Sequence, residues 1–434
     1  MTSLWNTLST QAQDIIFFAV LLLPLLMCAA VLMRGYAPAP LVRALLWRFR
    51  WANITFVLLI AISVGVGIGL LAQERGLRIG SAKAADKFDL VISAPGSDQT
   101  MMLATVFLQP TVTPLLNGNT FAEVANHPRT ESAAPLAFGD SYQSHPVVGT
   151  TADFIKNLTD DQIEGRMFET IDEAVVGAEI DLPIGGHFEP SHGVADSVEG
   201  GHGFNITVVG RMAPTGSPWD YALIVPVESV WDTHGLANGH APNQSHLGAP
   251  FDPEFFPGTP AIIVKADSLV GNYQLQSQFN RDLETMAFFP GGVLSNLYRI
   301  MGDMRQAMSI MALISQSLVA VSVLLGMFIL SRLFARQLGL LRAIGAPRRF
   351  VLSVVWSYAT VLVTTGSLLG IGLGLAASEV IGQIISERTQ ISVPTGLRWS
   401  ELHLVAAFVS ATSILSLIPA ASALRGSILA ALHA

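Results

Sequence analysis

Cysteine and charged residues are both scarce in this sequence. Its 434 residues include one cysteine, Cys28, so no disulfide can form within the chain. Only 13% of the residues are charged, against about 25% in a typical soluble domain, and 51% are hydrophobic. This composition excludes a disordered chain and argues against an ordinary cytosolic enzyme, because so much apolar surface requires lipid.

The common nucleotide-binding and catalytic motifs are also missing. None of the four lysines follows a glycine, so the Gly-Lys pair of a P-loop is absent. The patterns G-x-S-x-G and H-E-x-x-H do not occur, and the spacing of serine and histidine marks no catalytic triad. We therefore predict that the chain is not itself an enzyme.

Long apolar stretches are abundant, and five are long enough to cross a bilayer, which takes about 20 residues per helix. The first contains Pro24, which should kink it, and no basic residue precedes it, so we expect a retained helix rather than a signal peptide. The five predicted transmembrane helices are residues 15–33, 52–72, 307–330, 351–377 and 402–424.

The charges are divided unevenly along the chain. Residues 73–304 hold 11 basic and 28 acidic side chains, while the remainder holds 13 basic and 4 acidic ones. The basic segments 34–50 and 332–349, with Arg425, should face the cytoplasm, which places the N-terminus and the acidic block outside. A block this acidic argues against nucleic acid as a partner. Residues 41–51 fit either an interfacial helix on membrane lipids or a plain basic flank.

The acidic block has the pattern of an α+β domain on two helices. Helix-compatible sequence runs from the second apolar stretch to about residue 86 and from residue 294 into the third, which predicts a two-helix stalk. Short β-branched runs between Gly, Pro, Asp and Asn indicate strands, and residues 121–128 and 160–169 look helical. The predicted fold class is an α-helical membrane protein with five transmembrane helices plus a large α+β extracytoplasmic domain.

One cytoplasmic motif carries a family resemblance. Residues 335–350, ARQLGLLRAIGAPRRF, resemble the E-I-G-L-L-R-A-x-G-A segment of FtsX/MacB-type (type VII) ABC transporter permeases, with Gln337 in place of the usual Glu. Residues 366–378 and 417–432 resemble the glycine-rich third core helix and the closing segment of that family. The start of the acidic block, FDLVISAPGS at 88–97, resembles a branch that includes haem-exporter-like permeases.

The resemblance implies a permease subunit that couples ATP turnover by a separate cytoplasmic ABC ATPase to movement of a MacB-like periplasmic domain (mechanotransmission). It also implies a homodimer in a bacterial inner membrane, export or extraction of a substrate, and a possible periplasmic binding or effector partner. The alternative is a non-transporting, FtsX-like regulator of a periplasmic protein. The residues that match the motif and are predicted to contact the ATPase are Gln337, Gly339, Leu341, Arg342, Gly345 and Arg348.

The predicted domains follow from these patterns. Residues 1–40 form an additional N-terminal transmembrane helix, and 41–86 form an interfacial helix, a transmembrane helix and a stalk. Residues 87–293 form the periplasmic domain. Residues 294–434 form the second stalk helix and three transmembrane helices of the permease domain.

Glycine recurs at helical spacing in the fourth apolar stretch. Gly366, Gly370 and Gly374 lie on one face of the expected helix, and Gly65 and Gly69 do the same in the second. Small residues let membrane helices approach closely, so these glycines mark a packing surface. The glycine spacing fits two helices that pack within one chain and helices of two chains that pack together equally well.

Histidine is concentrated outside the predicted membrane helices. His187, His192 and His202 lie in a glycine-rich stretch with acidic neighbours, and imidazole and carboxylate groups are zinc ligands. Their spacing fits no standard zinc motif, so one interpretation is solvated loop histidines and the other is a metal site. No other cofactor is indicated.

Overall fold

The structure is a computed structural model that describes residues 5, 7–192, 204–244, 246–300, 302–333 and 335–422. The chain divides into two compact units. The membrane unit comprises residues 1–76, 303–383 and 395–434, and the outer unit comprises residues 77–302 and 384–394.

Five helices of the described residues are long and apolar enough to cross a membrane, which confirms the predicted number. The fourth of them extends to Thr389, well beyond the predicted end at residue 377. The helices that provide these spans are α2 (Thr10–Met33), α4 (Arg50–Ala85), α11 (Gly302–Leu333), α13 (Arg348–Thr389), and α14 (Trp399–Leu415) with α15 (Leu417–Ser422).

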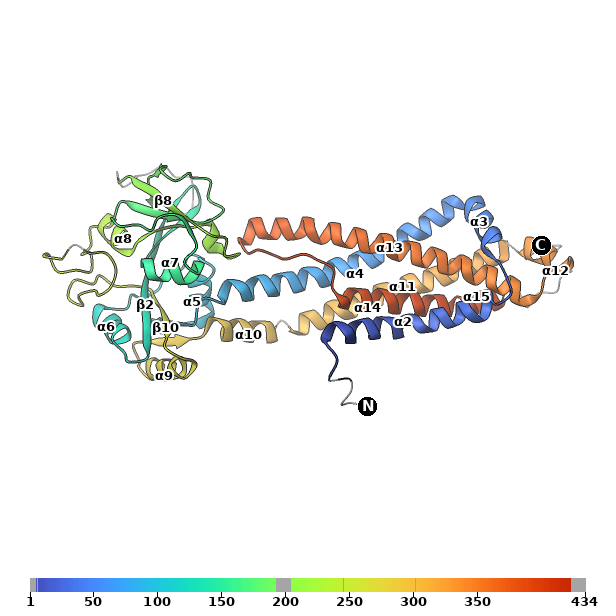
Figure 1. The fold of residues 1–434 in the computed structure, drawn as a ribbon, viewed down its shortest axis with the longest axis horizontal. Coiled ribbons are helices and arrows are strands. Elements are labelled where there is room, and N and C mark those ends of the chain that lie inside the picture. The colour runs from blue at the N-terminus through green and yellow to red at the C-terminus, as the bar shows by residue number, and fades with distance from the viewer. Residues whose placement is uncertain are drawn as a thin grey trace. The chain divides into compact units, whose positions relative to one another are not determined.

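The additional N-terminal helix packs along α14 (Figure 1). The Ser410 hydroxyl donates to the Leu21 carbonyl at 2.6 Å, three residues before Pro24, and His403 Nε2 lies 3.0 Å from the Asp14 carbonyl oxygen. The Phe17 ring meets His403 edge-on at 4.8 Å. These contacts join α2 to α14 at two levels, so α2 belongs to the folded membrane unit.

A short helix, α3 (Ala39–Arg48), precedes α4. Its buried side chains, Val42 and Leu45, join a cluster with residues of α4, α13 and α14, while Trp47 is largely exposed. The helix is therefore amphipathic, with its apolar side on the bundle, as an interfacial helix would be.

The outer unit is built on one mixed sheet of eleven strands, in the order β11-β1-β10-β2-β3-β9-β5-β8-β4 with β6 on β8 and β7 on β2. Most neighbours are antiparallel, and the pairs β3–β9 and β5–β8 are parallel. The strands are β1 (Leu90–Ser93), β2 (Thr130–Tyr142), β3 (His145–Thr150), β4 (Ile163–Gly165), β5 (Glu173–Val176), β6 (His187–Phe188), β7 (Ser191–His192), β8 (Ile206–Met212), β9 (Leu223–Pro226), β10 (Ala261–Ala266) and β11 (Met286–Phe288).

Helices cover both faces of this sheet (Figure 1). Side chains alternate across a strand, so Leu90 and Ile92 enter one core cluster and Val91 enters the other. The first cluster is covered by α6 (Gly118–Ala125), α8 (Val227–Thr233) and α9 (Leu269–Phe279). The second is covered by α5 (Asp98–Thr105), α7 (Ala152–Thr159), α10 (Pro290–Ile300) and the end of α4.

One predicted helix is wrong. Residues 160–169 contain strand β4 instead, which pairs antiparallel with β8. Asp160 and Asp161 both adopt positive φ, at 52° and 60°, which ends α7 and turns the chain toward the sheet. The local composition favours a helix, but hydrogen bonding to β8 stabilises a strand instead.

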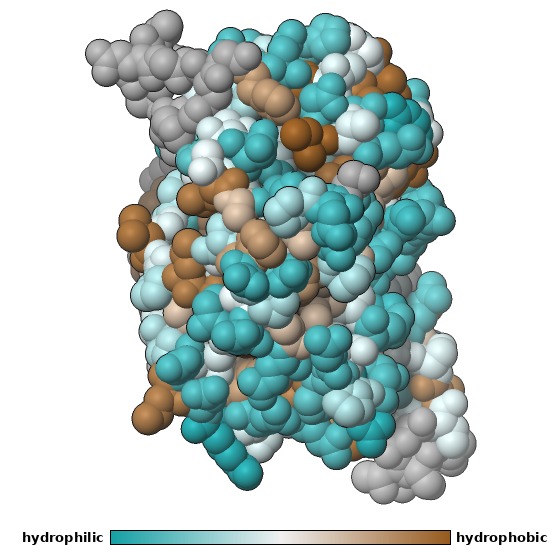
Figure 2. Space-filling model, turned by 90° about the vertical axis from the view of Figure 1, so that its left-hand side faces the viewer, coloured by the Kyte–Doolittle hydropathy of each residue, from teal (hydrophilic) through white to brown (hydrophobic). Residues whose placement is uncertain are grey.

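The outer unit has a water-compatible surface. Figure 2 shows hydrophilic side chains over most of one face of it, with apolar residues in small separate groups. This agrees with the acidic composition of residues 73–304 and with a domain outside the lipid.

Candidate functional site: the connection between α11 and α13

The resemblance motif folds as a short helix, α12 (Ala335–Ala343), between α11 and α13. Leu338 is buried, and Leu341 packs partly against the cluster that also holds Val42 of α3 and Val351 of α13. One face of α12 is therefore fixed to the end of the membrane bundle.

The end of α12 is a Schellman motif centred on Gly345. The Ala346 N–H donates to the Leu341 carbonyl at 2.9 Å, and the Gly345 N–H donates to the Arg342 carbonyl at 3.2 Å. Gly345 has φ +100°, which side-chain-bearing residues rarely adopt. Pro347 follows, and α13 starts at Arg348. The Gly-Ala-Pro part of the motif therefore has a structural role: it reverses the chain between two helices.

The opposite side of α12 is open. Leu340 is 58% exposed and Ile344 is 77% exposed, one turn apart. Gln337, Gly345 and Arg348 are exposed as well, and Arg342 is half-buried. The six predicted contact residues thus divide: Gly339 is buried and Leu341 partly buried on the bundle side, and the other four reach the surface. Leu340 and Ile344 were not among the predicted contact residues, although an apolar pair at i and i+4 in a loop predicted to face the cytoplasm was a usable signal.

The three glycines of α13 lie against α4 within the membrane unit. A Cβ atom at Gly366 or Gly370 would lie 2.7 Å from Ile60 or Val64, respectively, and one at Gly374 would lie 2.8 Å from the Gly65 carbonyl oxygen. Real Cβ atoms do not approach so closely, so the α4–α13 contact requires glycine at these positions. Whether two copies of the chain also pack through glycine stays a prediction.

The histidines predicted to bind metal are only partly described. His187, in β6, is exposed, and its Nδ1 lies 3.0 Å from the Thr207 hydroxyl. His192 lies in β7 opposite Asp140 of β2 in the backbone register, and His202 falls outside the described residues. Among the residues that the structure describes, no group of three His, Cys, Asp or Glu side chains is arranged to hold a metal ion.

Comparison with known proteins identifies the C-terminal part. Residues 307–428 match the family model described as FtsX-like permease C-terminal. This part of the chain is an FtsX-like permease domain. The match contains α12 and the α13 glycines, and it confirms the family assignment drawn from the 335–350 motif. The haem-exporter branch stays a prediction.

Two further comparisons concern the chain as a whole. The periplasmic region of MacB from Actinobacillus actinomycetemcomitans aligns over 50% of this chain and 94% of its own, with 10% sequence identity and a TM-score of 0.30. A likeness of this degree does not establish a shared fold. Among curated proteins, none matches the sequence.

Proposed function

We propose that the chain is the permease subunit of a type VII ABC transporter in a bacterial inner membrane. It would couple ATP turnover by a separate cytoplasmic ATPase to movement of the outer unit, and so to export or extraction of a substrate. The observation that carries the proposal is α12: a capped helix, fixed to the bundle on one side and presenting Leu340 and Ile344 on the other, inside an FtsX-like permease domain.

The chemistry of α12 suits a protein partner. Two exposed apolar side chains one turn apart can enter a groove, and the adjacent arginines can meet acidic groups at its rim. The Schellman cap holds this surface in one conformation, so little conformational entropy is lost on docking. Because α13 begins three residues after Gly345 and runs as one helix to Thr389, motion of α12 would be carried along α13.

Two variants of α12 test the ATPase contact. Leu340→Asp and Arg342→Glu should each weaken assembly with the co-expressed ATPase, or reduce its stimulated activity, by about tenfold, which corresponds to about 1.4 kcal/mol. Arg43→Glu, an equal charge reversal on an exposed residue of α3, is the matched control and should retain activity. Wild-type assembly and ATPase activity in both α12 variants would remove the coupling role.

A second experiment distinguishes a transporter from a non-transporting regulator. For a transporter, reconstituted complex with ATP should move or release a substrate without any further protein. If ATPase coupling is intact but the complex acts only by switching on a periplasmic hydrolase, the FtsX-like regulator is the function instead.

The proposal also includes a zinc site in the outer unit. His234 Nε2 lies 3.7 Å from Asp140 Oδ1, and the backbone of His192 pairs with that of Asp140. A carboxylate and an imidazole thus lie beside the strand that carries His192, which supports His192 as a ligand; His187 and His202 complete the proposed zinc site.

A further inference from the structure

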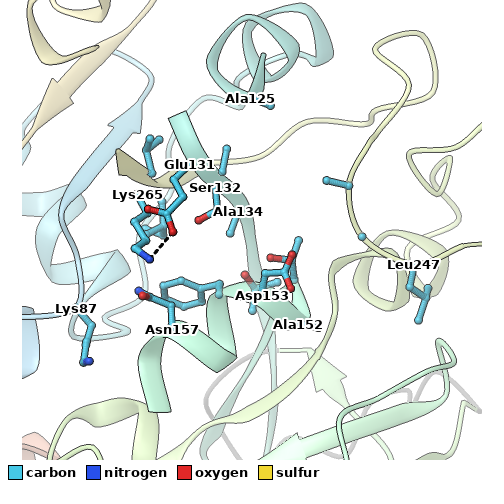
Figure 3. A pocket seen from close by; sticks show the side chains of 18 of the residues that line it. Lys87, Ala125, Glu131, Ser132, Ala134, Ala152, Asp153, Asn157, Leu247 and Lys265 are labelled. Carbon is cyan, nitrogen blue, oxygen red and sulfur yellow. Dashed lines mark hydrogen bonds and ion pairs between the residues drawn. The ribbon is translucent and has the colours of Figure 1, made fainter. Parts of the chain in front are cut away.

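The outer unit contains a cavity of about 330 Å³, within the range of about 300–1,000 Å³ usual for small-molecule sites. It lies among strands β2 and β10, the start of α7, and the loop that contains Leu247. Figure 3 shows Lys265 and Glu131 joined on one side, with Asn157 of α7 below Lys265, Leu247 on the opposite side, and Asp153 of α7 between the two sides.

The lysines of this cavity are already neutralised. Lys265 Nζ lies 2.7 Å from Glu131 Oε1, and Lys87 forms an ion pair with Asp160. Neither lysine therefore offers an unpaired positive charge to a ligand. Asp153, largely exposed, lies in the first turn of α7, where its carboxylate disfavours a second anion at that helix end.

A buried carboxylate lines the same cavity. Glu228 is 2% exposed, and its Oε1 accepts a hydrogen bond from the Gly248 N–H at 2.5 Å. His240 Nε2 lies 3.2 Å from the same oxygen, and His240 Nδ1 is buried without a partner among the described residues. Within the described residues, neither a lysine nor an arginine contacts Glu228.

A second polar group in the cavity wall is unsatisfied. The Thr150 hydroxyl, at the end of β3, is fully buried and has no hydrogen-bond partner within the described structure. A buried hydroxyl that stays unpaired is unfavourable, and a ligand that donates to it removes this cost. The remaining wall includes the apolar side chains of Phe154, Phe168 and Ile263.

We propose that this cavity binds a small organic ammonium ion. Its positive charge pairs with Glu228, one N–H donates to the Thr150 hydroxyl, and its apolar body lies against Phe154 and Phe168. A buried carboxylate that has no lysine or arginine partner among the described residues is stabilised by a bound cation and not by an anion. The inference does not depend on the ATPase contact of α12, because every residue that carries it lies in the outer unit.

Three probes of one shape test the charge preference in the full-length protein in nanodiscs. Benzylamine should bind in calorimetric or ligand-observed NMR titrations, and benzyl alcohol and benzoate should bind at least tenfold more weakly. Tighter binding of benzoate would place an anion at the α7 end and overturn the proposal, as would equal affinity for all three probes. This comparison needs no variant, so it remains decisive if a substitution prevents folding.

Variants locate the site. Glu228→Gln keeps an acceptor for the Gly248 N–H and should weaken benzylamine at least tenfold, while Thr150→Val, which keeps the side-chain shape, should weaken it severalfold. Glu123→Gln, at an exposed acid of α6 outside the cavity, should leave the affinity unchanged. Unchanged benzylamine binding in folded Glu228→Gln would overturn the proposal.

Discussion

Arg75 of α4 forms a buried ion pair with Glu401, in the first turn of α14. Glu401 is 1% exposed, and its other carboxylate oxygen accepts the Arg398 N–H at 2.8 Å. The second guanidinium nitrogen of Arg75 donates to the Gly396 carbonyl at 2.5 Å. One arginine thus joins α4 to both the start of α14 and the segment before it.

Removing the charge from this pair should be strongly destabilising. Glu401→Gln leaves the Arg75 guanidinium buried without a counter-ion, which costs about 3–5 kcal/mol when one partner of a buried pair is removed. Asp267→Asn breaks the exposed pair with Arg129 and should lower stability far less, because solvent screens that pair. Thermal unfolding of both full-length variants in one detergent gives the comparison, and equal shifts would show that the Arg75–Glu401 pair is dispensable.

Two glycines of α13 should respond oppositely to the same substitution. Gly370→Ala places a methyl group 2.7 Å from Val64 Cβ and 2.9 Å from the Ala61 carbonyl oxygen, so α4 and α13 must separate, at about 1–3 kcal/mol. Gly372 has nothing within 4 Å, so Gly372→Ala should be neutral or stabilise the helix by up to about 1 kcal/mol. The unfolding midpoints measure the difference, and a similar loss in both variants would contradict the α4–α13 packing.

Acid should weaken the outer unit through Glu173. Hydrogen bonding to Arg166 holds the pKa of the Glu173 carboxyl at about 2, below its ordinary value of 4.5. Because the folded-state pKa is the lower one, this contribution to the free energy of unfolding is fully present above pH 4.5 and is lost as the pH falls toward 2. Glu173→Gln should therefore be less stable than wild type at pH 7, with the gap narrowing below pH 4.5 in chemical unfolding followed by tryptophan fluorescence. If the difference in free energy of unfolding between the two proteins did not change with pH, the Glu173 carboxyl would not be the source of the acid sensitivity.

The topology can be read with tags in intact cells. Tags at residue 1 and within 189–203 should be accessible from outside, because the arginine-rich segments 34–50 and 332–349 are expected to face the cytoplasm. A tag after Ala434 should be protected. Protection of the tag at residue 1 would contradict five membrane crossings with this orientation.

Zinc binding should depend on pH and on the predicted histidines. Zinc ligation requires neutral imidazoles, so affinity should fall below about pH 6.5, and binding should protect residues 187–203 from proteolysis. Alanine at His187, His192 and His202 together should abolish both effects, while His127→Ala, in the turn before β2, should not. Equal heats of zinc titration for the triple variant and the wild type would remove these histidines from the proposal.

The membrane part of the fold was predictable because its signals are local. A run of apolar residues must satisfy its backbone groups as a helix in lipid, whatever surrounds it. The 335–350 motif was equally visible, although the sequence did not show that Gly345 caps a helix while Leu340 and Ile344 form the exposed surface. Those roles depend on which face of α12 meets the bundle.

The outer unit was less predictable because its strands depend on distant partners. The longest strand, β2, was missed: Pro135 and Gly139 interrupt its pattern, yet it pairs with β10 and β3 on its two sides. Gly139 lies at a register shift between Phe138 and Asp140, where an irregular strand tolerates it.

The five apolar helices, the acidic block and the family of the C-terminal domain could all be predicted from the amino-acid sequence, because composition and short motifs encode each of them. Three further features became visible in the folded protein: the α13 glycines face α4, Arg75 pairs with Glu401, and Glu228 and Thr150 line one cavity. These residues lie tens to hundreds of positions apart in the chain. Close packing brings them together, and no local pattern records which distant residue will fill each contact.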